Sequence, residues 1–171
     1  YSYALGSQGS TRKKLARASG CILEFVAELA CMVGFEDQRS RAATYLKWLL
    51  NQRQGNSDVG DVSGRDDVLP VKVPKQSVGF ITGTRGETLR LIERDTGTFM
   101  FTSGRSASDV AEETLLIFAA TGECRQHAAR IIRDECERHQ QMGELEAGQK
   151  AVPKAIPMAA PGLTMASPLA A

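Results

Sequence analysis

Short blocks of apolar and polar residues predict the same series of helices and strands in two parts of the chain. The C-terminal block begins with an alternating apolar run, Val71 and Val73, which ends at Pro74 and is typical of a strand. The order predicted there is strand, helix, helix, strand, strand and helix, over residues 68–73, 77–82, 87–96, 98–102, 114–120 and 123–141. Residues 114–120 are apolar throughout, so this strand is expected to be central and buried on both faces.

The N-terminal block predicts the same order without its first strand. After a helix that closes on Gly20, residues 21–26 and 29–33 are β-branched and aromatic enough for a hairpin. Residues 36–53 then form a helix whose apolar stripe contains Ala42, Tyr45, Leu46, Leu49 and Leu50. Trp48 falls off the centre of that stripe. Because the missing strand belongs to the sheet, this block is expected to expose an unpaired edge and part of an apolar face.

A glycine-bounded loop precedes the second helix of each block. The C-terminal loop is Gly83-Thr84-Arg85-Gly86, and residues 4–11 align with residues 81–88 at one fixed offset that also pairs Gly20 with Gly97. The N-terminal loop, Gly6-Ser7-Gln8-Gly9, is therefore the second copy of an internal repeat. Glycine permits positive φ and the close approach of another backbone, and the free N–H groups of the following helix can bind a phosphate.

This order of elements around a flanked glycine loop resembles the type I K homology (KH) domain, whose G-x-x-G loop clamps a nucleic-acid backbone. The residues that carry the resemblance run from Ile81 to Leu89, with Ile92 and Thr96-Gly97. The fold that it implies is α+β: two β-α-α-β-β-α units, each a three-stranded antiparallel sheet covered by three helices on one face, the first lacking its first strand. The expected domains are a partial KH unit, a flexible linker, a complete KH unit and a disordered tail rich in Ala, Pro and Met, over residues 1–53, 54–67, 68–141 and 142–171.

The resemblance also implies the residues that would bind nucleic acid. In the complete unit these are the loop, a helical wall, one strand residue and one residue of the variable loop: Gly83, Thr84, Arg85, Gly86, Val78, Ile81, Leu89, Met100 and Arg105. A place in the core is an equally good interpretation for the four apolar members. In the partial unit the candidates are Gly6, Ser7, Gln8, Gly9, Arg12, Lys13 and Lys14. That loop contains no cation, so the basic run beyond it either compensates or is an ordinary solvated helix face.

Strand alternation gives Phe99 and Phe101 a different role from Met100. If Met100 faces the helices, both phenylalanines point to the opposite side of the sheet, which faces water in a single KH fold. Two such rings predict a docking surface, either for the first unit or for another protein. A shifted strand register would explain the same pattern.

Composition excludes few classes of protein. The formal net charge is +1, so any nucleic-acid surface must be local rather than spread over the whole chain. No run of eighteen apolar residues predicts a membrane span, and a chain that begins at Tyr1 suggests a longer parent. The pairs Cys124/His127 and Cys136/His139 lie on one predicted helix, about 18 Å apart at 1.5 Å per residue, so they cannot share a zinc ion. The four cysteines, Cys21, Cys31, Cys124 and Cys136, show no C-x-x-C spacing, which favours a reduced compartment, cytoplasmic or nuclear.

The leading hypothesis is therefore a non-catalytic protein, without a cofactor or metal, that binds single-stranded RNA or single-stranded DNA and regulates RNA after transcription. The sequence contains no P-loop, no G-x-G-x-x-G motif and no nucleophile near a histidine, so none of these enzyme signatures supports catalysis. The alternative is an interaction scaffold built on KH folds that no longer bind nucleic acid. The low net charge, the uncharged N-terminal loop and the two outward phenylalanines, Phe99 and Phe101, favour that alternative.

Overall fold

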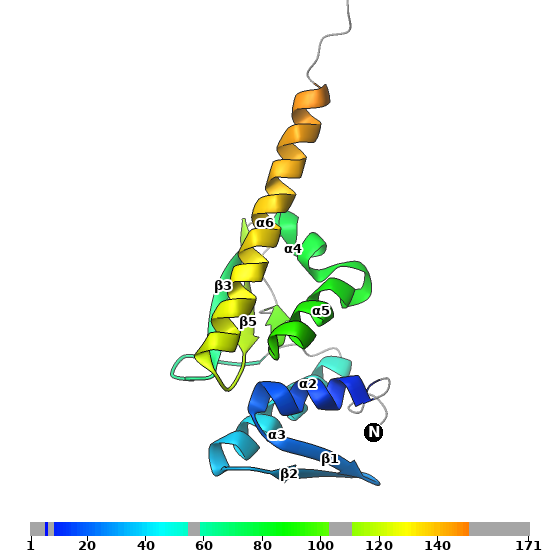
Figure 1. Ribbon diagram of the computed structural model, residues 1–171, viewed down its shortest axis with the longest axis vertical. Coiled ribbons are helices and arrows are strands. Elements are labelled where there is room, and N and C mark those ends of the chain that lie inside the picture. Colours follow the sequence, from blue (N-terminus) through cyan, green and yellow to red (C-terminus); the bar gives the residue numbers. More distant parts are fainter. Residues whose placement is uncertain (1–5, 7–8, 55–58, 103–110, 151–171) are drawn as a thin grey trace, which may run out of the picture.

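The computed structural model describes residues 6, 9–54, 59–102 and 111–150, with side chains up to residue 145. Two parts lie one above the other in Figure 1, and we call residues 9–54 the N-terminal segment and residues 59–150 the C-terminal segment. Ser7, Gln8, Arg105 and the tail from residue 151 lie outside the described residues.

The C-terminal segment contains a three-stranded antiparallel sheet in the order β3-β5-β4. Its strands and helices are β3 (Val68–Pro74), α4 (Lys75–Thr82), the 3-10 turn η2 (Thr84–Gly86), α5 (Glu87–Thr96), β4 (Phe99–Thr102), β5 (Glu112–Phe118) and α6 (Gly122–Lys150). The predicted central strand is confirmed, because β5 pairs with both β3 and β4. It ends earlier than predicted, because the N–H of Ala119 donates to Asp67 O (3.1 Å) and that of Ala120 to Ala18 O (2.6 Å) instead of continuing the ladder.

The N-terminal segment is a two-stranded hairpin with two helices. Its elements are α2 (Ser10–Ser19), β1 (Ile22–Val26), β2 (Leu29–Val33) and α3 (Glu36–Arg53). Strands β1 and β2 pair directly through a tight turn, in which Ala27 has a φ of 50°. The predicted hairpin and the predicted long helix are both confirmed.

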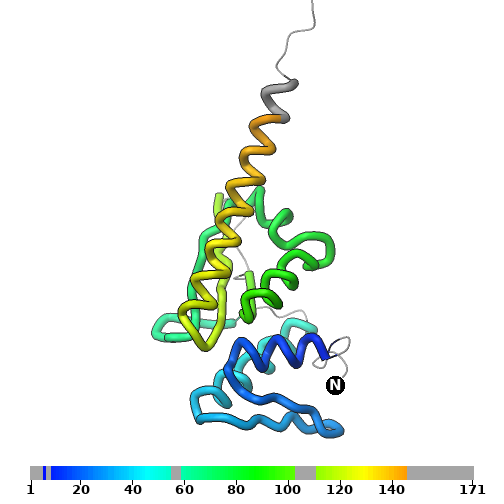
Figure 2. Tube along the Cα trace, in the orientation of Figure 1, coloured from blue at the N-terminus to red at the C-terminus, as the bar shows by residue number. Residues whose placement is uncertain are grey.

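Helices pack against both faces of the sheet of the C-terminal segment. In Figures 1 and 2, α6 crosses in front of β3 and β5, and α2 and α3 lie below them. Helices α4, α5 and α6 cover one face, and the core between them and the sheet contains Val71, Val73, Ile81, Ile92, Met100, Leu115, Ile117, Ala128, Ala129, Ile132 and Cys136. Helices α2 and α3 cover the other face, where a second core contains Leu15, Ala18, Leu23, Tyr45, Leu49, Phe99, Phe101, Leu116 and Phe118. The predicted division of β4 is confirmed, with Met100 facing one core and both phenylalanines facing the other.

The second core is an aromatic cluster that joins the two segments. The Tyr45 ring lies 5.6 Å from the Phe99 ring, centroid to centroid, and Trp48 meets Phe101 edge-on at 6.1 Å. Trp48 also lies 5.0 Å from Phe118. Its position off the centre of the α3 stripe thus serves contact with the next segment. The outer face of this sheet, expected to be open in a single unit, is covered by the chain itself.

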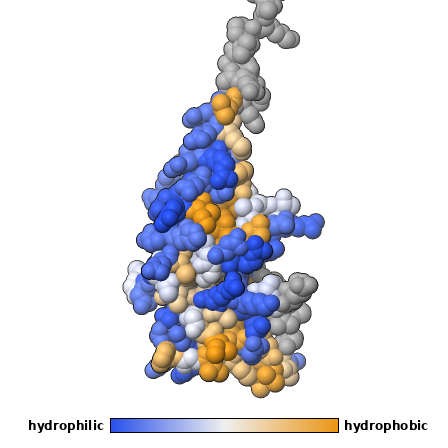
Figure 3. Space-filling model, viewed as in Figure 1, coloured by the Kyte–Doolittle hydropathy of each residue, from blue (hydrophilic) through white to orange (hydrophobic). Residues whose placement is uncertain are grey.

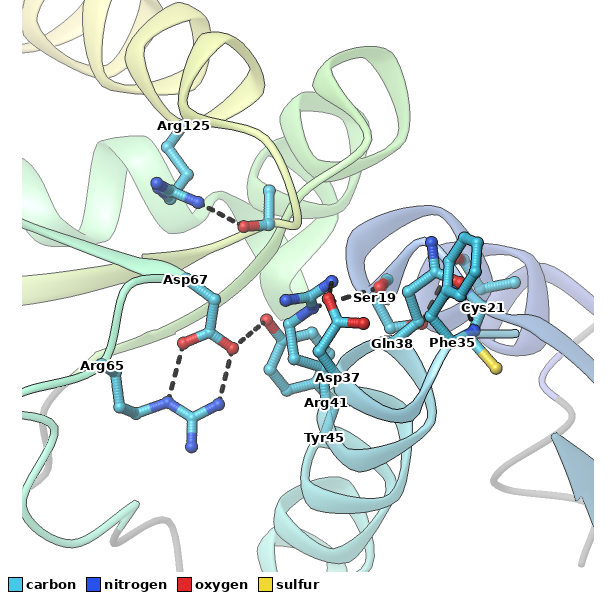
Figure 4. Close-up of polar contacts among 12 residues, drawn as sticks. Ser19, Cys21, Phe35, Asp37, Gln38, Arg41, Tyr45, Arg65, Asp67 and Arg125 are labelled. Atoms are coloured by element: carbon cyan, nitrogen blue, oxygen red, sulfur yellow. Dashed lines mark hydrogen bonds and ion pairs between the residues drawn. The ribbon is translucent and has the colours of Figure 1, made fainter. Parts of the chain in front are cut away.

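Part of the segment between α3 and β3 packs against this cluster as well. Val59 and Val62 are partly buried against it. Figure 4 shows the carboxylate of Asp67 between the guanidinium of Arg65 and the hydroxyl of Tyr45, which donates a hydrogen bond of 2.8 Å. Residues 54–67 were expected to be a flexible linker, whereas residues 59–67 make these contacts. The side chains of Val59, Val62 and Asp67 thus pack or hydrogen-bond against the cluster that α3 contributes to.

The hairpin exposes its outer face, as expected for a block that lacks a strand. Ile22, Val26, Leu29 and Val33 are between 61% and 69% exposed and share that face by the strand register. Orange atoms at the bottom of Figure 3 mark part of this surface. Among the described residues, β2 has β1 as its one partner, so its second edge is free.

The last helix is longer than predicted. α6 reaches Lys150, whereas a disordered tail was expected from residue 142, so that expectation is wrong for residues 142–150. The physical reason is that residues 142–150 are mostly good helix formers and the first proline that could stop the helix is Pro153.

Candidate nucleic-acid interface

The loop between α4 and α5 depends on its two glycines. Gly83 has a φ of 69°, and a Cβ there would lie 3.0 Å from the backbone N of Thr88. Gly86 has a φ of 78° and donates its N–H to Gly83 O at 3.2 Å. Arg85, between them, also has a positive φ, 55°, which is uncommon outside glycine. Three of the four residues therefore hold the tight turn that brings the backbone to the start of α5.

The loop before α2 repeats this geometry at both of its glycines. Gly6 and Gly9 both have a φ of 72°, and Gly9 N donates to Gly6 O at 3.3 Å. A Cβ on Gly6 would lie 2.7 Å from the backbone N of Thr11, the counterpart of Thr88. The helix ends correspond too, since Ser19 Oγ donates to Leu15 O (2.7 Å) and Thr96 Oγ1 donates to Ile92 O (2.6 Å).

Each loop leads into a helix whose start has no side-chain cap. Gly9 and Gly86 are the N-cap residues of α2 and α5, and no cap side chain accepts a hydrogen bond from the first N–H groups of either helix. The first N–H groups of a helix have no partner within it, and its N-terminus is positive, so both starts can receive an anion. Glu87 opposes this in the first turn of α5, while the first turn of α2 contains no acidic residue.

The comparison with protein families gives one match. Residues 68–134 match the family model of the KH domain. One KH domain is therefore found in the C-terminal segment, and the mixed α+β fold with antiparallel strands is consistent with it. The KH family suggests nucleic-acid binding in general, and KH domains are typically non-catalytic binding domains. No curated protein matches the chain.

Two of the cations predicted to contact nucleic acid are held within the protein. Nη1 of Arg12 donates to Leu23 O at 3.0 Å and pairs with Glu24, and Nζ of Lys14 lies 2.8 Å from Glu93 Oε2. By contrast, Lys13, Thr84 and Arg85 are exposed. Neither Lys13 nor Arg85 makes an ion pair with any described residue, so both are available to a ligand.

The apolar candidates in the KH domain fall into two groups. Ile81 and Met100 are 3% and 4% exposed and belong to the core. Val78 and Leu89 are half-buried and line a depression of about 10 Å³ with Ile81, Thr82, Thr102 and Glu113. That volume is about what one water needs, so the described residues form a shallow floor rather than a base pocket. Val78 and Leu89 are the members of this set that a ligand can touch.

Sequence reasoning missed Glu93, which is 3% exposed and organises the junction of the two segments. Its Oε1 accepts a hydrogen bond from Met100 N at 2.8 Å, while Oε2 faces Lys14. Burial raises the pKa of Glu93, and the nearby Lys14 ammonium opposes that rise without cancelling it. The available signal was its spacing, since Glu93 follows Leu89 by one helical turn and so lies on the apolar stripe of α5.

Two further searches concern other kinds of site. The described side chains contain no group of three His, Cys, Asp or Glu residues that could hold a metal ion. His139 instead lies with its Nδ1 3.1 Å from Ser77 Oγ and its ring stacked 4.8 Å from Phe80. Within the same described residues, no helix combines the length and the apolar character needed to cross a membrane.

Proposed function

We propose that this protein binds single-stranded RNA through the Gly83–Gly86 loop of its KH domain. The observation that carries the proposal is the exposed, positive-φ turn at the start of α5. This turn contains the cation Arg85, which forms no ion pair with any residue that the structure describes. Backbone N–H groups there suit a phosphate, and Arg85 adds a charge-assisted contact. Val78 and Leu89 offer apolar surface for unstacked bases next to the loop.

The proposal includes the N-terminal segment as a second, partial KH unit. Three features that the two segments share support this assignment. The loop glycines have similar φ values and are joined by the same Gly-to-Gly hydrogen bond. At the helix ends, the hydroxyls of Ser19 and Thr96 donate to the carbonyl four residues earlier. Binding in the cytoplasm or nucleus, in regulation of RNA after transcription, completes the hypothesis.

The test places two negative charges at the loop and keeps both glycines. The double variant Thr84→Asp/Arg85→Asp should weaken binding to a pool of single-stranded RNA at least tenfold, because it repels phosphate and removes a cation. The matched control is Gln126→Asp/Arg130→Asp, two exposed positions on α6 with the same change in charge. Circular dichroism and thermal unfolding verify that both variants remain folded. Unchanged affinity of the folded loop variant would reject the assignment.

Single-stranded DNA of the same sequence is the comparison ligand. Contacts to the 2′-hydroxyl favour RNA at a given site, whereas phosphate contacts alone do not discriminate. Tighter binding of RNA than of DNA therefore supports reading of the sugar, and equal affinities indicate a site that reads mainly the backbone.

An interaction scaffold is the second candidate, and the shallow Val78/Leu89 floor favours it. Phe99 and Phe101 no longer favour it, because α3 covers them. A salt titration separates the two functions. Binding through phosphate contacts weakens steeply as salt rises, whereas an apolar protein interface does not.

A further inference from the structure

A cleft lies between α2 and α5. The start of α2 and the turn between α4 and α5 lie on the same side of the molecule (Figure 1). The volume of the cleft is about 1050 Å³. It is lined by Ser10, Thr11, Lys13, Lys14, Arg17, Thr84, Arg85, Glu87, Arg90, Leu91, Glu93, Arg94 and Asp95. Both segments therefore contribute walls, and the residues directly after each loop, Ser10 and Glu87, are among the lining residues.

The two helices meet at one end and diverge at the other. Near their C-terminal ends, Arg17 Nη1 donates to Arg94 O at 3.1 Å, and Lys14 pairs with Glu93. Their N-terminal ends lie farther apart (Figure 1), and Thr11 on α2 and Thr84 beside α5 also line the cleft. The positive ends of two helix dipoles therefore border the cleft.

The lining of the cleft is basic although the chain as a whole is nearly neutral. Its cations are Lys13, Lys14, Arg17, Arg85, Arg90 and Arg94, and its acids are Glu87, Glu93 and Asp95. Two of the acids are already paired, Glu93 with Lys14 and Asp95 with Arg94. Lys13, Arg85 and Arg90 are exposed, and none of them forms a salt bridge with a described residue. The charge of Arg90 acts on Glu93, where it opposes the rise in the pKa of that carboxyl. Lys13 and Arg85 therefore line the cleft without a charged partner among the described residues.

We propose that this cleft binds the phosphodiester backbone of a nucleic-acid strand that continues from the Gly83–Gly86 loop towards α2. This inference rests on the proposed function and extends it, because the groove beside Val78 and Leu89 is a different surface. The cations are spread over both helices rather than gathered at one point, which suits a chain of phosphates better than one small anion. The junction of the two segments thereby becomes part of the binding surface.

The experiment compares two lengths of single-stranded RNA. The short one has about four nucleotides, the length that a KH loop clamps, and the long one is about three times that length. The cleft variant is Lys13→Gln/Arg90→Gln. The matched control is Lys47→Gln/Arg133→Gln, exposed positions on α3 and α6 with the same loss of charge.

The long RNA should bind the cleft variant about tenfold more weakly than the wild type, as expected for two lost exposed ion pairs. The dependence of log affinity on log salt should become shallower by about 1.4, since each phosphate contact to a single strand contributes about 0.7. The short RNA should bind both proteins equally, and the control variant should resemble the wild type with either RNA.

Each other outcome has a definite meaning. If the cleft variant binds the long RNA as the wild type does, or if the wild type binds both lengths equally, the cleft inference is wrong while the proposed function stands. If the wild type binds neither RNA, both are wrong. If adenosine triphosphate binds the wild type and loses affinity in the cleft variant while the long RNA does not, the cleft serves a small phosphate ligand and the inference is also wrong.

Discussion

The ammonium of Lys14 lies 2.8 Å from the carboxylate of Glu93, and this pair joins the N-terminal segment to the KH domain. The same ammonium lies 4.8 Å from the centre of the Phe99 ring. Because Glu93 also accepts the Met100 N–H, both of its oxygens have partners where water is excluded. One acidic side chain thus connects α5, β4 and α2, and it forms the closed end of the basic cleft.

Replacing Lys14 should therefore destabilise the whole chain. Lys14→Met leaves a carboxylate that is 3% exposed without its counter-charge, and we expect the free energy of unfolding to fall by about 3 kcal/mol. Urea unfolding measures the change. Lys13→Met is the matched control, because the neighbouring lysine is exposed, and it should change stability by less than about 0.5 kcal/mol. Equal losses in the two variants would contradict the structural role of the pair.

The cost of losing Lys14 should depend on pH. Burial raises the pKa of Glu93 in the folded protein, so protonation favours folding. That contribution is fully present below the ordinary glutamate pKa of about 4.3 and is lost as pH rises through the folded value. The destabilisation by Lys14→Met should accordingly be smaller at pH 4.5 than at pH 7, whereas Glu93→Gln removes this dependence. Unfolding curves over that range decide the point.

Asp67 should show the opposite dependence on pH. Burial raises its pKa, but hydrogen bonds from Arg65 and Tyr45 outweigh burial and hold the pKa of Asp67 below its ordinary value. Its contribution is present above about pH 4 and is lost as pH falls through the lower folded value. Asp67→Asn should cost about 2 kcal/mol at pH 7 and progressively less below pH 4.

Tyr45→Phe separates the hydroxyl from the rest of this network. Burial raises the pKa of Tyr45, so its hydroxyl stays protonated and donates to Asp67 throughout that range. The variant should cost about 1 kcal/mol, because it removes one hydrogen bond and keeps the ring. A loss at pH 7 as large as that of Asp67→Asn would indicate that the ion pair with Arg65 contributes little.

The loop glycines predict a contrast within one short stretch. Gly83→Ala combines a φ of 69° with a Cβ 3.0 Å from Thr88 N, so we expect a loss of about 1 to 3 kcal/mol and weaker RNA binding. Gly79→Ala is the control, since a Cβ there meets no atom within 4 Å and lies inside α4. It should stabilise the protein by about 0.5 to 1 kcal/mol. Thermal unfolding of both variants, with RNA binding, measures the contrast.

Local pattern was sufficient for some features and not for others. Alternation separated Met100 from Phe99 and Phe101, and glycine spacing located both loops. Pattern did not reveal that Tyr45 and Trp48 cover those phenylalanines, because a helix stripe shows which residues are apolar and not which distant surface they meet. The partners of Lys14 and Asp67 could not be predicted for the same reason, because the sequence does not show whether a charged side chain is buried or which distant residue it contacts.

Because α2 and α3 cover this face of the sheet, the substitution Phe101→Thr should have opposite effects in the full chain and in a fragment that lacks both helices. In the full chain Phe101 is 3% exposed and contacts Trp48, so Phe101→Thr should cost about 3 kcal/mol of unfolding free energy. A fragment of residues 59–150 lacks α2 and α3 and would present Phe99, Phe101 and Phe118 to water. Such a face promotes self-association, which analytical ultracentrifugation measures.

In that fragment the same substitution should help rather than harm. Threonine keeps β propensity while it removes exposed apolar area, so the fragment with Phe101→Thr should associate less than the unchanged fragment. Met100→Thr is the matched control on the neighbouring position, because Met100 faces the α4–α5–α6 core and its loss should destabilise both forms. If Phe101→Thr destabilises the fragment as much as the full chain, then α2 and α3 are not what buries this ring.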